Sequence, residues 1–284
     1  MEELIIEAYG KVNLALDVIR KRNDGYHDIN TIMQQIDLKD IVTIRDREKG
    51  IKIECDNPEI PVDSSNLVYT AWEKMKEKAK IDRGVHIIIE KNIPVASGLA
   101  GGSTDAAAVL KGLNKLWKLN FSKKELMDIG VSIGADVPYC IMGGTALAEG
   151  IGEKLKILKS FSNKLILLAN PGISVSTAHV YNSLRLDKIE KSPDMDMLVQ
   201  AVENDDIYTL AKNMGNVLEQ VTVEEFSQIK TIKEDMIRYG ALGSLMSGSG
   251  PTVFGLFDDE KKLVKCKEYL EKKVAKVIIT KTIE

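Results

Sequence analysis

The chain is poor in the residues that build disulfide and metal sites. Its 284 residues include only three cysteines, Cys55, Cys140 and Cys266, which lie far apart and form no C-x-x-C pair. An odd number of separated cysteines excludes a disulfide framework and a cysteine-rich zinc site, and it favours a reducing cytoplasm. The three histidines are equally scattered, so the sequence predicts no histidine metal cluster.

The sequence also lacks long apolar runs and any excess of positive charge. No stretch approaches the roughly 20 apolar residues needed to cross a bilayer. The acidic start, Met1–Leu4, has neither the basic residues nor the apolar core of a signal peptide. The 39 Lys and Arg residues are balanced by 42 Asp and Glu residues, which gives a formal net charge of −3 and no electrostatic footprint for nucleic acid. We therefore expect a cytoplasmic protein that binds neither nucleic acid nor a membrane.

The composition is that of a globular protein with a large core. Hydrophobic residues make up 44% of the chain and charged residues 29%. At roughly 150 residues per domain, the length predicts one large domain or two ordinary ones. The composition changes around residues 150–164, where two glycines lead into a lysine-rich stretch. We therefore predict an N-terminal domain at 1–155 and a C-terminal domain at 156–284.

Hydrophobic periodicity predicts strands and helices in both halves of the chain. In the first half, the predicted strands are 4–8, 12–19, 29–36, 41–45, 51–55 and 85–90, with a strand or a hairpin at 139–148, and the predicted helices are 66–79, 122–133 and one that starts at Thr104. In the second half, the predicted strands are 165–169, 242–246, 252–257 and 276–280, and the predicted helices are 176–184, 259–272 and two or three within 197–239. Neither half shows strict βαβα alternation, so we predict the α+β class.

A glycine-rich stretch, Pro94–Val109, joins a predicted strand to a predicted helix. Between the two elements, Gly98, Gly101 and Gly102 let the backbone turn tightly and approach a ligand closely. Successive N–H groups at a helix start form an anion site, which the helix dipole strengthens. A phosphate is therefore the expected ligand.

Two familiar phosphate loops are excluded because their sequence motifs are absent from this stretch. A Walker A loop ends in Gly-Lys-Ser/Thr, whereas Gly102 is followed directly by Ser103 and the loop holds no lysine. A Rossmann loop needs G-x-G-x-x-G, which the glycine positions here do not fit. The alternative is a turn that only caps the helix, because Ser103, Thr104 and Asp105 would cap it without a ligand.

Two charged residues elsewhere are candidates for chemistry. Lys11 lies with Asn13 among apolar strand residues, and a buried lysine needs an anionic partner or a function. The bare residues slightly favour the alternative that its ammonium reaches water from a strand end. Asp136 is held in a turn, Gly134–Pro138, after a helix. Phosphoryl transfer uses such a carboxylate to accept a hydroxyl proton or to position a metal, and the alternative is an Asx turn.

Two loops complete the set of candidates. In Asp24–His27, a tyrosine and a histidine beside a turn are suited to a flat base, although a hairpin tip with packed aromatics is more common. Ser247–Pro251 offers a backbone-rich wall for a phosphate or a substrate, and its alternative is a tight turn between strands. Each signal is weak alone, and their joint occurrence with the glycine-rich stretch is much stronger.

Together these stretches resemble the GHMP kinase superfamily. Pro94–Asp105 is similar to its phosphate loop P-x-x-x-G-L-G-G-G-S-S-D, with Ala100 in place of a glycine and Thr104 in place of a serine. Alanine at position 100 is harmless if its φ is negative and costly if its φ is positive. The matching motifs run from residue 8 to residue 257. The strings D-G-Y-H and G-A-D-V-P are similar to those of the member whose acceptor is methylerythritol joined to cytidine diphosphate, whereas the G-E-H string of a galactokinase is absent.

The resemblance implies a fold, an activity and a nucleotide site. The fold would be a ribosomal-protein-S5-like N-terminal domain followed by an α+β C-terminal domain. The activity would be ATP-dependent phosphorylation of the acceptor's 2-hydroxyl, in the non-mevalonate route to isoprenoid precursors, with ATP and Mg²⁺ as cofactors. The implied ATP-binding residues are Pro94, Gly98, Leu99, Ala100, Gly101, Gly102, Ser103 and Thr104, with Asn66 and Lys91 near the adenine. Mg²⁺ would bridge the β- and γ-phosphates, and whether Ser103 or Thr104 touches it is left open.

The resemblance also assigns roles at the acceptor. Asp136 would accept the hydroxyl proton, while Lys11 would keep Asp136 ionised and stabilise the developing alkoxide. The implied acceptor-binding residues are Tyr26 and His27 at the cytosine, Tyr181 stacking beside them, and Asn13 and Thr177 at the methylerythritol or its phosphates.

Two other functions remain open at this point. A GHMP kinase for a smaller alcohol or a phosphomonoester would give the Tyr26–His27 pair no base to recognise. A non-catalytic nucleotide-binding regulator would have no need of both Lys11 and Asp136. The oligomeric state has no signal in the sequence.

Overall fold

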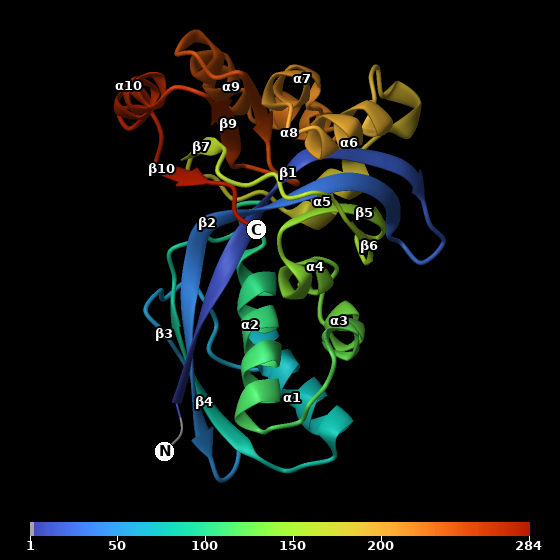
Figure 1. Cartoon of the computed structure of the whole chain (residues 1–284), viewed down its shortest axis with the longest axis vertical. Coiled ribbons are helices and arrows are strands. Elements are labelled where there is room, and N and C mark those ends of the chain that lie inside the picture. The colour runs from blue at the N-terminus through green and yellow to red at the C-terminus, as the bar shows by residue number, and fades with distance from the viewer. Residues whose placement is uncertain (1–2) are drawn as a thin grey trace. The chain divides into compact units, whose positions relative to one another are not determined.

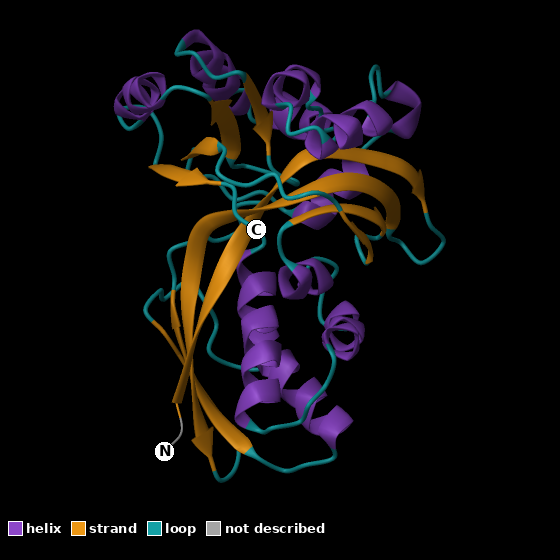
Figure 2. Ribbon diagram, in the orientation of Figure 1, coloured by secondary structure: helices purple, strands orange, loops and turns teal. Residues whose placement is uncertain are grey.

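The computed structural model describes residues 3–284 and divides into two compact units that interleave along the chain (Figures 1 and 2). The first unit takes residues before Lys11 together with 38–95 and 100–142, and the second takes 11–37, 96–99 and 143–284. The long strands β1 (Glu3–Lys21) and β2 (His27–Arg47) contribute residues to both units. Because no single cut separates the units, the boundary predicted between residues 155 and 156 stays a prediction.

The first unit packs helices against one face of a small sheet, as Figure 2 shows. Strand β4 (Gly84–Glu90) pairs antiparallel with residues 41–47 of β2 and parallel with β3 (Ile51–Cys55). The helices are α1 (Leu67–Ala79), α2 (Gly101–Leu116), α3 (Lys123–Val131) and α4 (Val137–Met142). Helix α2 lies so close to the sheet that a Cβ at Gly112 would stand 2.4 Å from the Ile44 side chain. The absence of a side chain at Gly112 therefore lets α2 lie this close to the sheet.

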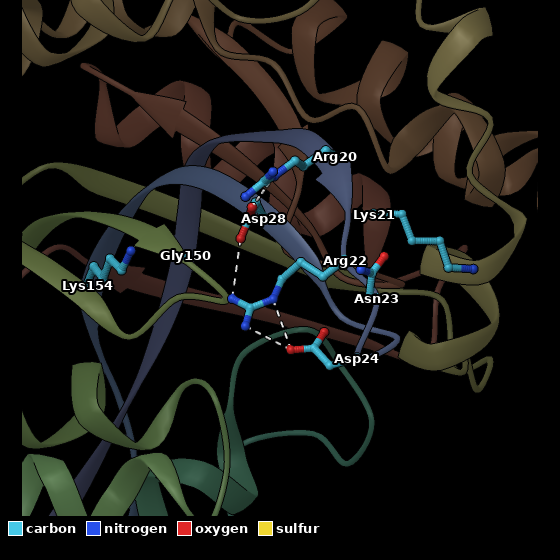
Figure 3. A pocket seen from close by; sticks show the side chains of 8 residues that line it. All are labelled: Arg20, Lys21, Arg22, Asn23, Asp24, Asp28, Gly150 and Lys154. Carbon is cyan, nitrogen blue, oxygen red and sulfur yellow. Dashed lines mark hydrogen bonds and ion pairs between the residues drawn. The ribbon is translucent and has the colours of Figure 1, made fainter.

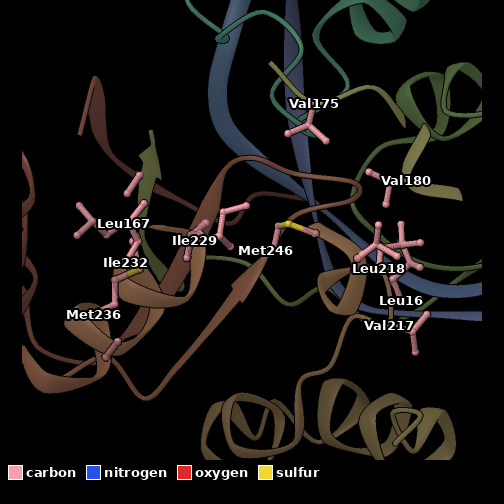
Figure 4. Packing of buried hydrophobic residues seen from close by; sticks show 14 of the residues in the cluster. Leu16, Leu167, Val175, Val180, Val217, Leu218, Ile229, Ile232, Met236 and Met246 are labelled. Carbon is pink, nitrogen blue, oxygen red and sulfur yellow. The ribbon is translucent and has the colours of Figure 1, made fainter. Parts of the chain in front are cut away.

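The second unit is built on a four-stranded antiparallel sheet. Its strand order is β10 (Lys276–Lys281), β7 (Leu165–Asn170), β9 (Val253–Phe257), β8 (Gly243–Met246). Residues 29–34 of β2 pair with β5 (Thr145–Gly150), which pairs with β6 (Lys154–Ile157). The helices are α5 (Thr177–Ser183), α6 (Met195–Glu203), α7 (Ile207–Asn213), α8 (Glu219–Glu225), α9 (Gln228–Arg238) and α10 (Glu260–Leu270), with a 3₁₀ turn at Leu186–Lys188. Figure 4 shows that Leu167 of β7 and Ile232 and Met236 of α9 belong to the core of this unit.

Most predicted elements are confirmed, with ends that differ by a few residues. The strands at 51–55, 85–90, 165–169 and 252–257 are present, as are the helices at 66–79, 122–133, 176–184 and 259–272. The ends are set by side-chain caps: Asn66 accepts from Val68 N, and Ser122 forms a capping box with Glu125. Among residues 3–284, no helix is long and apolar enough to span a bilayer.

Four local predictions are wrong. Segments 4–8 and 12–19 form one strand, β1, and segments 29–36 and 41–45 form one strand, β2, because sheet pairing outweighs the polar residues between them. Residues 197–239 lie within a region that holds four helices, α6 to α9, rather than two or three. Helix α2 begins at Gly101, three residues before Thr104.

The fourth error concerns the stretch predicted as a strand or a hairpin at 139–148. Residues up to Met142 form helix α4, and the strand begins only at Thr145. Pro138 does not keep Val137 out of the helix, because it lies in the first turn, where its missing N–H group has no intrahelical partner to lose.

Candidate active site

The backbone φ angles of the glycine-rich stretch alternate in sign. Ala96, Gly98 and Ala100 have φ values of +48°, +76° and +62°, whereas the residues between them do not have positive φ. Such alternation turns successive N–H groups toward one concave side and makes an anion-binding nest. Helix α2 starts directly after it, and its N-cap residue, Ala100, makes no side-chain cap bond. The first N–H groups of α2 therefore remain available to an anion.

The alternative that Ser103, Thr104 or Asp105 caps this helix is wrong. All three lie inside α2. The Thr104 hydroxyl donates to the carbonyl oxygen of Tyr9 at 2.7 Å, and Asp105 pairs with Lys91. The loop thus keeps its N–H groups free of side-chain acceptors at the one place where a phosphate is expected.

Replacing Ala100 by glycine should raise the free energy of unfolding by about 0.5–1 kcal/mol. Alanine in the left-handed region costs roughly 1–2 kcal/mol, and glycine removes that cost while adding less than this in unfolded-state entropy. The matched control is Ala79→Gly at the end of α1, which has ordinary helical geometry and should lose stability. Urea unfolding of both variants checks the sign, and an Ala100→Gly variant no more stable than the wild type would contradict the expectation.

The Ser247–Pro251 loop lies directly against the phosphate loop. Ser247 Oγ donates to the Gly98 carbonyl oxygen at 3.0 Å, and Thr252 N donates to the Ser97 carbonyl oxygen at 3.4 Å. The two backbones are so close that a Cβ at Gly98 would stand 2.2 Å from the Ser247 carbonyl oxygen. The loop is also a tight turn, with a bond from Gly250 N to Ser247 O and a cis peptide before Pro251. The two alternatives for Ser247–Pro251, a tight turn and a backbone wall, therefore describe the same structure.

Lys11 is buried beside this pair of loops. Its side chain is 4% exposed, so the alternative that its ammonium reaches water is wrong. Nζ donates to Asn13 Oδ1 at 2.8 Å, and Asn13 Nδ2 donates to Thr31 Oγ1 at 2.9 Å. The backbone N–H of Lys11 donates to the Leu99 carbonyl oxygen at 3.1 Å. A chain of hydrogen bonds thus holds a buried positive charge next to the phosphate loop.

Asn66 and Lys91 both make bonds within their own unit. Asn66 caps α1 and donates to the Pro61 carbonyl oxygen at 2.7 Å. The Lys91 ammonium is buried between the carboxylates of Asp40 and Asp105. Burial raises the pKa of Asp105 to about 7 against the opposing charge of Lys91. The sequence did not single out the Asp40–Lys91–Asp105 triad, because its members are far apart in the chain. The predicted role of Asn66 and Lys91 near the adenine stays a prediction.

Asp136 occupies the residue before helix α4 and is half-buried. Its carbonyl oxygen accepts from Cys140 N at 3.0 Å, which is the first bond of that helix. Val137 N in turn donates to the Gly134 carbonyl oxygen at 3.1 Å. Glycine, aspartate and the short helix together hold the backbone of Asp136 in one conformation, and its predicted catalytic role stays a prediction.

The hairpin between β1 and β2 carries Tyr26 and His27 on a tip braced by ion pairs. Figure 3 shows the Arg22 guanidinium bonded to the carboxylates of Asp24 and Asp28, at 2.8 Å and 3.4 Å. Arg22 N also donates to the Tyr26 carbonyl oxygen at 2.8 Å. Tyr26 remains 58% exposed, so the tip presents an accessible aromatic ring.

His27 and Tyr181 form an aromatic pair, although they are far apart in sequence. Their ring centroids are 5.4 Å apart and the planes are tilted by 36°. Burial, with a contribution from the charge of Lys21, lowers the pKa of His27. The ring is therefore neutral at neutral pH and offers one donor and one acceptor. Thr177, one turn before Tyr181 on α5, places its hydroxyl oxygen 2.9 Å from Ser249 Oγ.

Both halves of the chain match models of one kinase family. Residues 66–144 match the GHMP kinases N terminal domain, and residues 198–276 match the GHMP kinases C terminal domain. A solved homoserine kinase from Cytophaga hutchinsonii shares the fold over 100% of this chain and 98% of its own, with a TM-score of 0.81 and 21% identity. The predicted α+β, two-domain GHMP fold is confirmed, and the matches over both halves of the chain place it among the GHMP kinases.

Relatives that match over the full length identify a narrower family within the GHMP kinases. A protein of Acetivibrio thermocellus named 4-diphosphocytidyl-2-C-methyl-D-erythritol kinase is 52% identical over 283 residues, which is 100% of both chains. A protein of the same name from Clostridium botulinum (strain Eklund 17B / Type B) is 52% identical over 98% of this chain and 99% of its own. A solved 4-(cytidine 5'-diphospho)-2C-methyl-D-erythritol kinase covers 99% of this chain and 100% of its own at 30% identity, with a TM-score of 0.83. The chain belongs to the family of the 4-diphosphocytidyl-2-C-methyl-D-erythritol kinases.

Proposed function

We propose that this protein transfers the γ-phosphate of ATP to the 2-hydroxyl of 4-diphosphocytidyl-2-C-methyl-D-erythritol, a step of non-mevalonate isoprenoid precursor synthesis. The observation that carries the proposal is the 52% identity, over its whole length, to relatives named for that acceptor. ATP is the phosphate donor of this kinase family. The nest at 96–100 and the uncapped start of α2 support the phosphate site.

Mg²⁺ is proposed as the cofactor that would bind together with the phosphates of ATP. It binds oxygen ligands, keeps several waters, and takes few protein groups when phosphates are present. Ser103 lies in the first turn of α2, whereas the Thr104 hydroxyl is buried and bonded to Tyr9 O. Ser103 is therefore the better hydroxyl ligand of the two that the sequence left open. When bound, the metal neutralises the charge that gathers on the transferred group.

Asp136 and Lys11 are proposed to act on the acceptor hydroxyl. Asp136 would accept its proton as the oxygen attacks, and Lys11 would offer a fixed positive charge to the developing alkoxide. The bond to Asn13 keeps the Lys11 ammonium in one position, so no reorganisation is needed during the reaction. Positioning and charge neutralisation supply most of the rate in phosphoryl transfer.

The cytosine is proposed to lie at Tyr26, His27 and Tyr181. A flat base can stack on the exposed ring of Tyr26 or on Tyr181, and neutral His27 can donate to or accept from its edge. Asn13 and Thr177 would contact the methylerythritol or its phosphates. Tyr26, His27 and Tyr181 distinguish this acceptor from a smaller alcohol, which carries no base.

The test is ADP release in the presence of ATP and Mg²⁺ with four acceptors. We expect turnover with cytidylylated methylerythritol, and none with methylerythritol phosphate, mevalonate or homoserine. Turnover only with one of the small acceptors would replace this proposal by another GHMP kinase activity. No turnover with any acceptor, together with measurable ATP binding, would favour a nucleotide-binding regulator.

A further inference from the structure

A segment before and within helix α8 holds the Ser247–Pro251 loop by its side chains. Asn216, only 7% exposed, donates from Nδ2 to the carbonyl oxygens of Met246 at 2.8 Å and Gly248 at 2.7 Å. Its Oδ1 accepts from Leu218 N at 3.0 Å. One amide therefore joins both sides of the loop's entry to the start of α8, and both of its donor hydrogens are used.

Two further side chains of the same segment bond the backbone of the loop and of the strand residue just before it. Glu219 Oε1 accepts from Met246 N at 2.7 Å. The fully buried Thr222 places Oγ1 3.3 Å from the Ser249 carbonyl oxygen and at the same distance from Leu218 O. We call Asn216, Glu219 and Thr222 the loop clamp.

The loop clamp is itself anchored to β1. Leu16 N donates to Gly215 O at 2.9 Å, and Val217 N donates to Leu16 O at 3.1 Å. Leu16 and Val217 both belong to the buried core of this unit, shown in Figure 4. The clamp therefore bonds the loop from a segment that is itself hydrogen-bonded to β1 and packed in the buried core.

The loop needs outside support because of its own composition. Gly248 and Gly250 have φ values of +56° and +85°, and glycine loses more conformational freedom on ordering than any other residue. The ordered loop has two contacts of consequence. Ser247 Oγ bonds the Gly98 carbonyl oxygen of the phosphate loop, and Ser249 Oγ lies 2.9 Å from the Thr177 hydroxyl oxygen.

We propose that Asn216, Glu219 and Thr222 are positioning residues for ATP, which act by fixing the Ser247–Pro251 loop against the phosphate loop. The inference rests on the proposed function for the identity of the nucleotide. The clamp residues do not touch the nucleotide. Without them the loop samples more conformations, the support at Gly98 is lost for part of the time, and ATP must order the site when it binds.

The first test is Asn216→Ala, compared with Asn213→Ala. Asn213 on α7 also donates from Nδ2 to a backbone carbonyl, that of Thr209, but it has no bond to the loop. For Asn216→Ala we expect the KM for ATP and the Kd of a non-hydrolysable ATP analogue to rise by about tenfold, which is about 1.4 kcal/mol and the scale of one or two hydrogen bonds. The Asn213→Ala variant should keep both wild-type values.

The second test keeps the side-chain shape. Thr222→Val removes the hydroxyl and should raise the KM for ATP by about threefold, on the scale of one weak hydrogen bond. Thr231→Val on α9 is the control for the bond within the helix, because Thr231, at an exposed site, also bonds the carbonyl four residues before it but has no bond to the loop. Assays are run well below the unfolding midpoint of each variant, so that all the enzyme is folded.

Loss of fold and loss of positioning give different results. If the clamp only stabilises the fold, Asn216→Ala lowers the unfolding midpoint and leaves the KM for ATP and the analogue Kd of the folded enzyme unchanged, which would overturn the proposal. Wild-type kinetics in both Asn216→Ala and Thr222→Val would overturn it as well. The analogue Kd needs no acceptor, so it decides the role of the clamp even if the wild-type protein phosphorylates none of the acceptors.

Discussion

Replacing Asp136 by asparagine is expected to lower kcat by roughly 10²–10⁴-fold while ATP still binds. Asparagine keeps the size of the side chain and loses the carboxylate that we propose accepts the hydroxyl proton. The backbone around residue 136 is held by the first bond of α4 and by the bond from Val137 N to Gly134 O, neither of which needs the carboxylate. The loss should therefore appear in kcat, with little change in the Kd of an ATP analogue.

The matched control is Asp128→Asn, an exposed aspartate on the neighbouring helix α3. It removes the same charge eight residues earlier and should leave kcat within about twofold of the wild-type value, as expected for a surface change. Near-normal turnover of Asp136→Asn would remove this residue from the mechanism. A comparable loss in both variants would point to net charge rather than to a proton acceptor.

Replacing Gly98 by alanine is expected to lower the free energy of unfolding by about 3 kcal/mol and to abolish most ATP-dependent turnover. The new Cβ would stand 2.2 Å from the Ser247 carbonyl oxygen, and neither a Cβ nor a backbone carbonyl can rotate away, so the two loops must separate. The left-handed φ of +76° adds a further cost. Separation also breaks the bond from Ser247 Oγ to Gly98 O, which holds the phosphate loop in place.

Gly50→Ala is the control for the backbone strain alone. Gly50 has a similar φ of +71°, but a Cβ there meets nothing within 4 Å. Chemical unfolding should show a loss of about 1 kcal/mol for Gly50→Ala, and its kinetics should be unchanged. Equal stability losses in the two variants, with ATP turnover retained in Gly98→Ala, would show that the close approach of the loops has no role in nucleotide binding.

Elements with a strong local signal are the ones that the sequence predicted well. The strand at 51–55 and the helix over 122–133 are present because β-branched residues, an amphipathic stripe and a capping box are all properties of adjacent residues. Helix α4 was missed because its local signal is weak. The six-residue helix is shorter than the pattern that distinguishes a helix from a strand, and the proline in its first turn resembles a break.

The surroundings of the candidate site residues could not be predicted from local sequence. Local sequence favoured an ammonium at Lys11 that reaches water, yet the side chain is buried. Burial depends on what packs over a strand, and β1 is covered by segments from distant parts of the chain. The Asp40–Lys91–Asp105 triad and the loop clamp depend in the same way on residues separated by tens of positions, which no local spacing brings together.

The sequence alone determined the class of this protein. The glycine-rich stretch, Asp24–His27 and Gly134–Pro138 are contiguous strings, and a contiguous string can be compared with a family motif before the fold is known. Only the tertiary structure decided the positive φ of Ala100, the burial of Lys11 and the support of the phosphate loop by Ser247 and Asn216. Each of these depends on the free energy of contacts between segments distant in sequence, which exists only once the chain has folded.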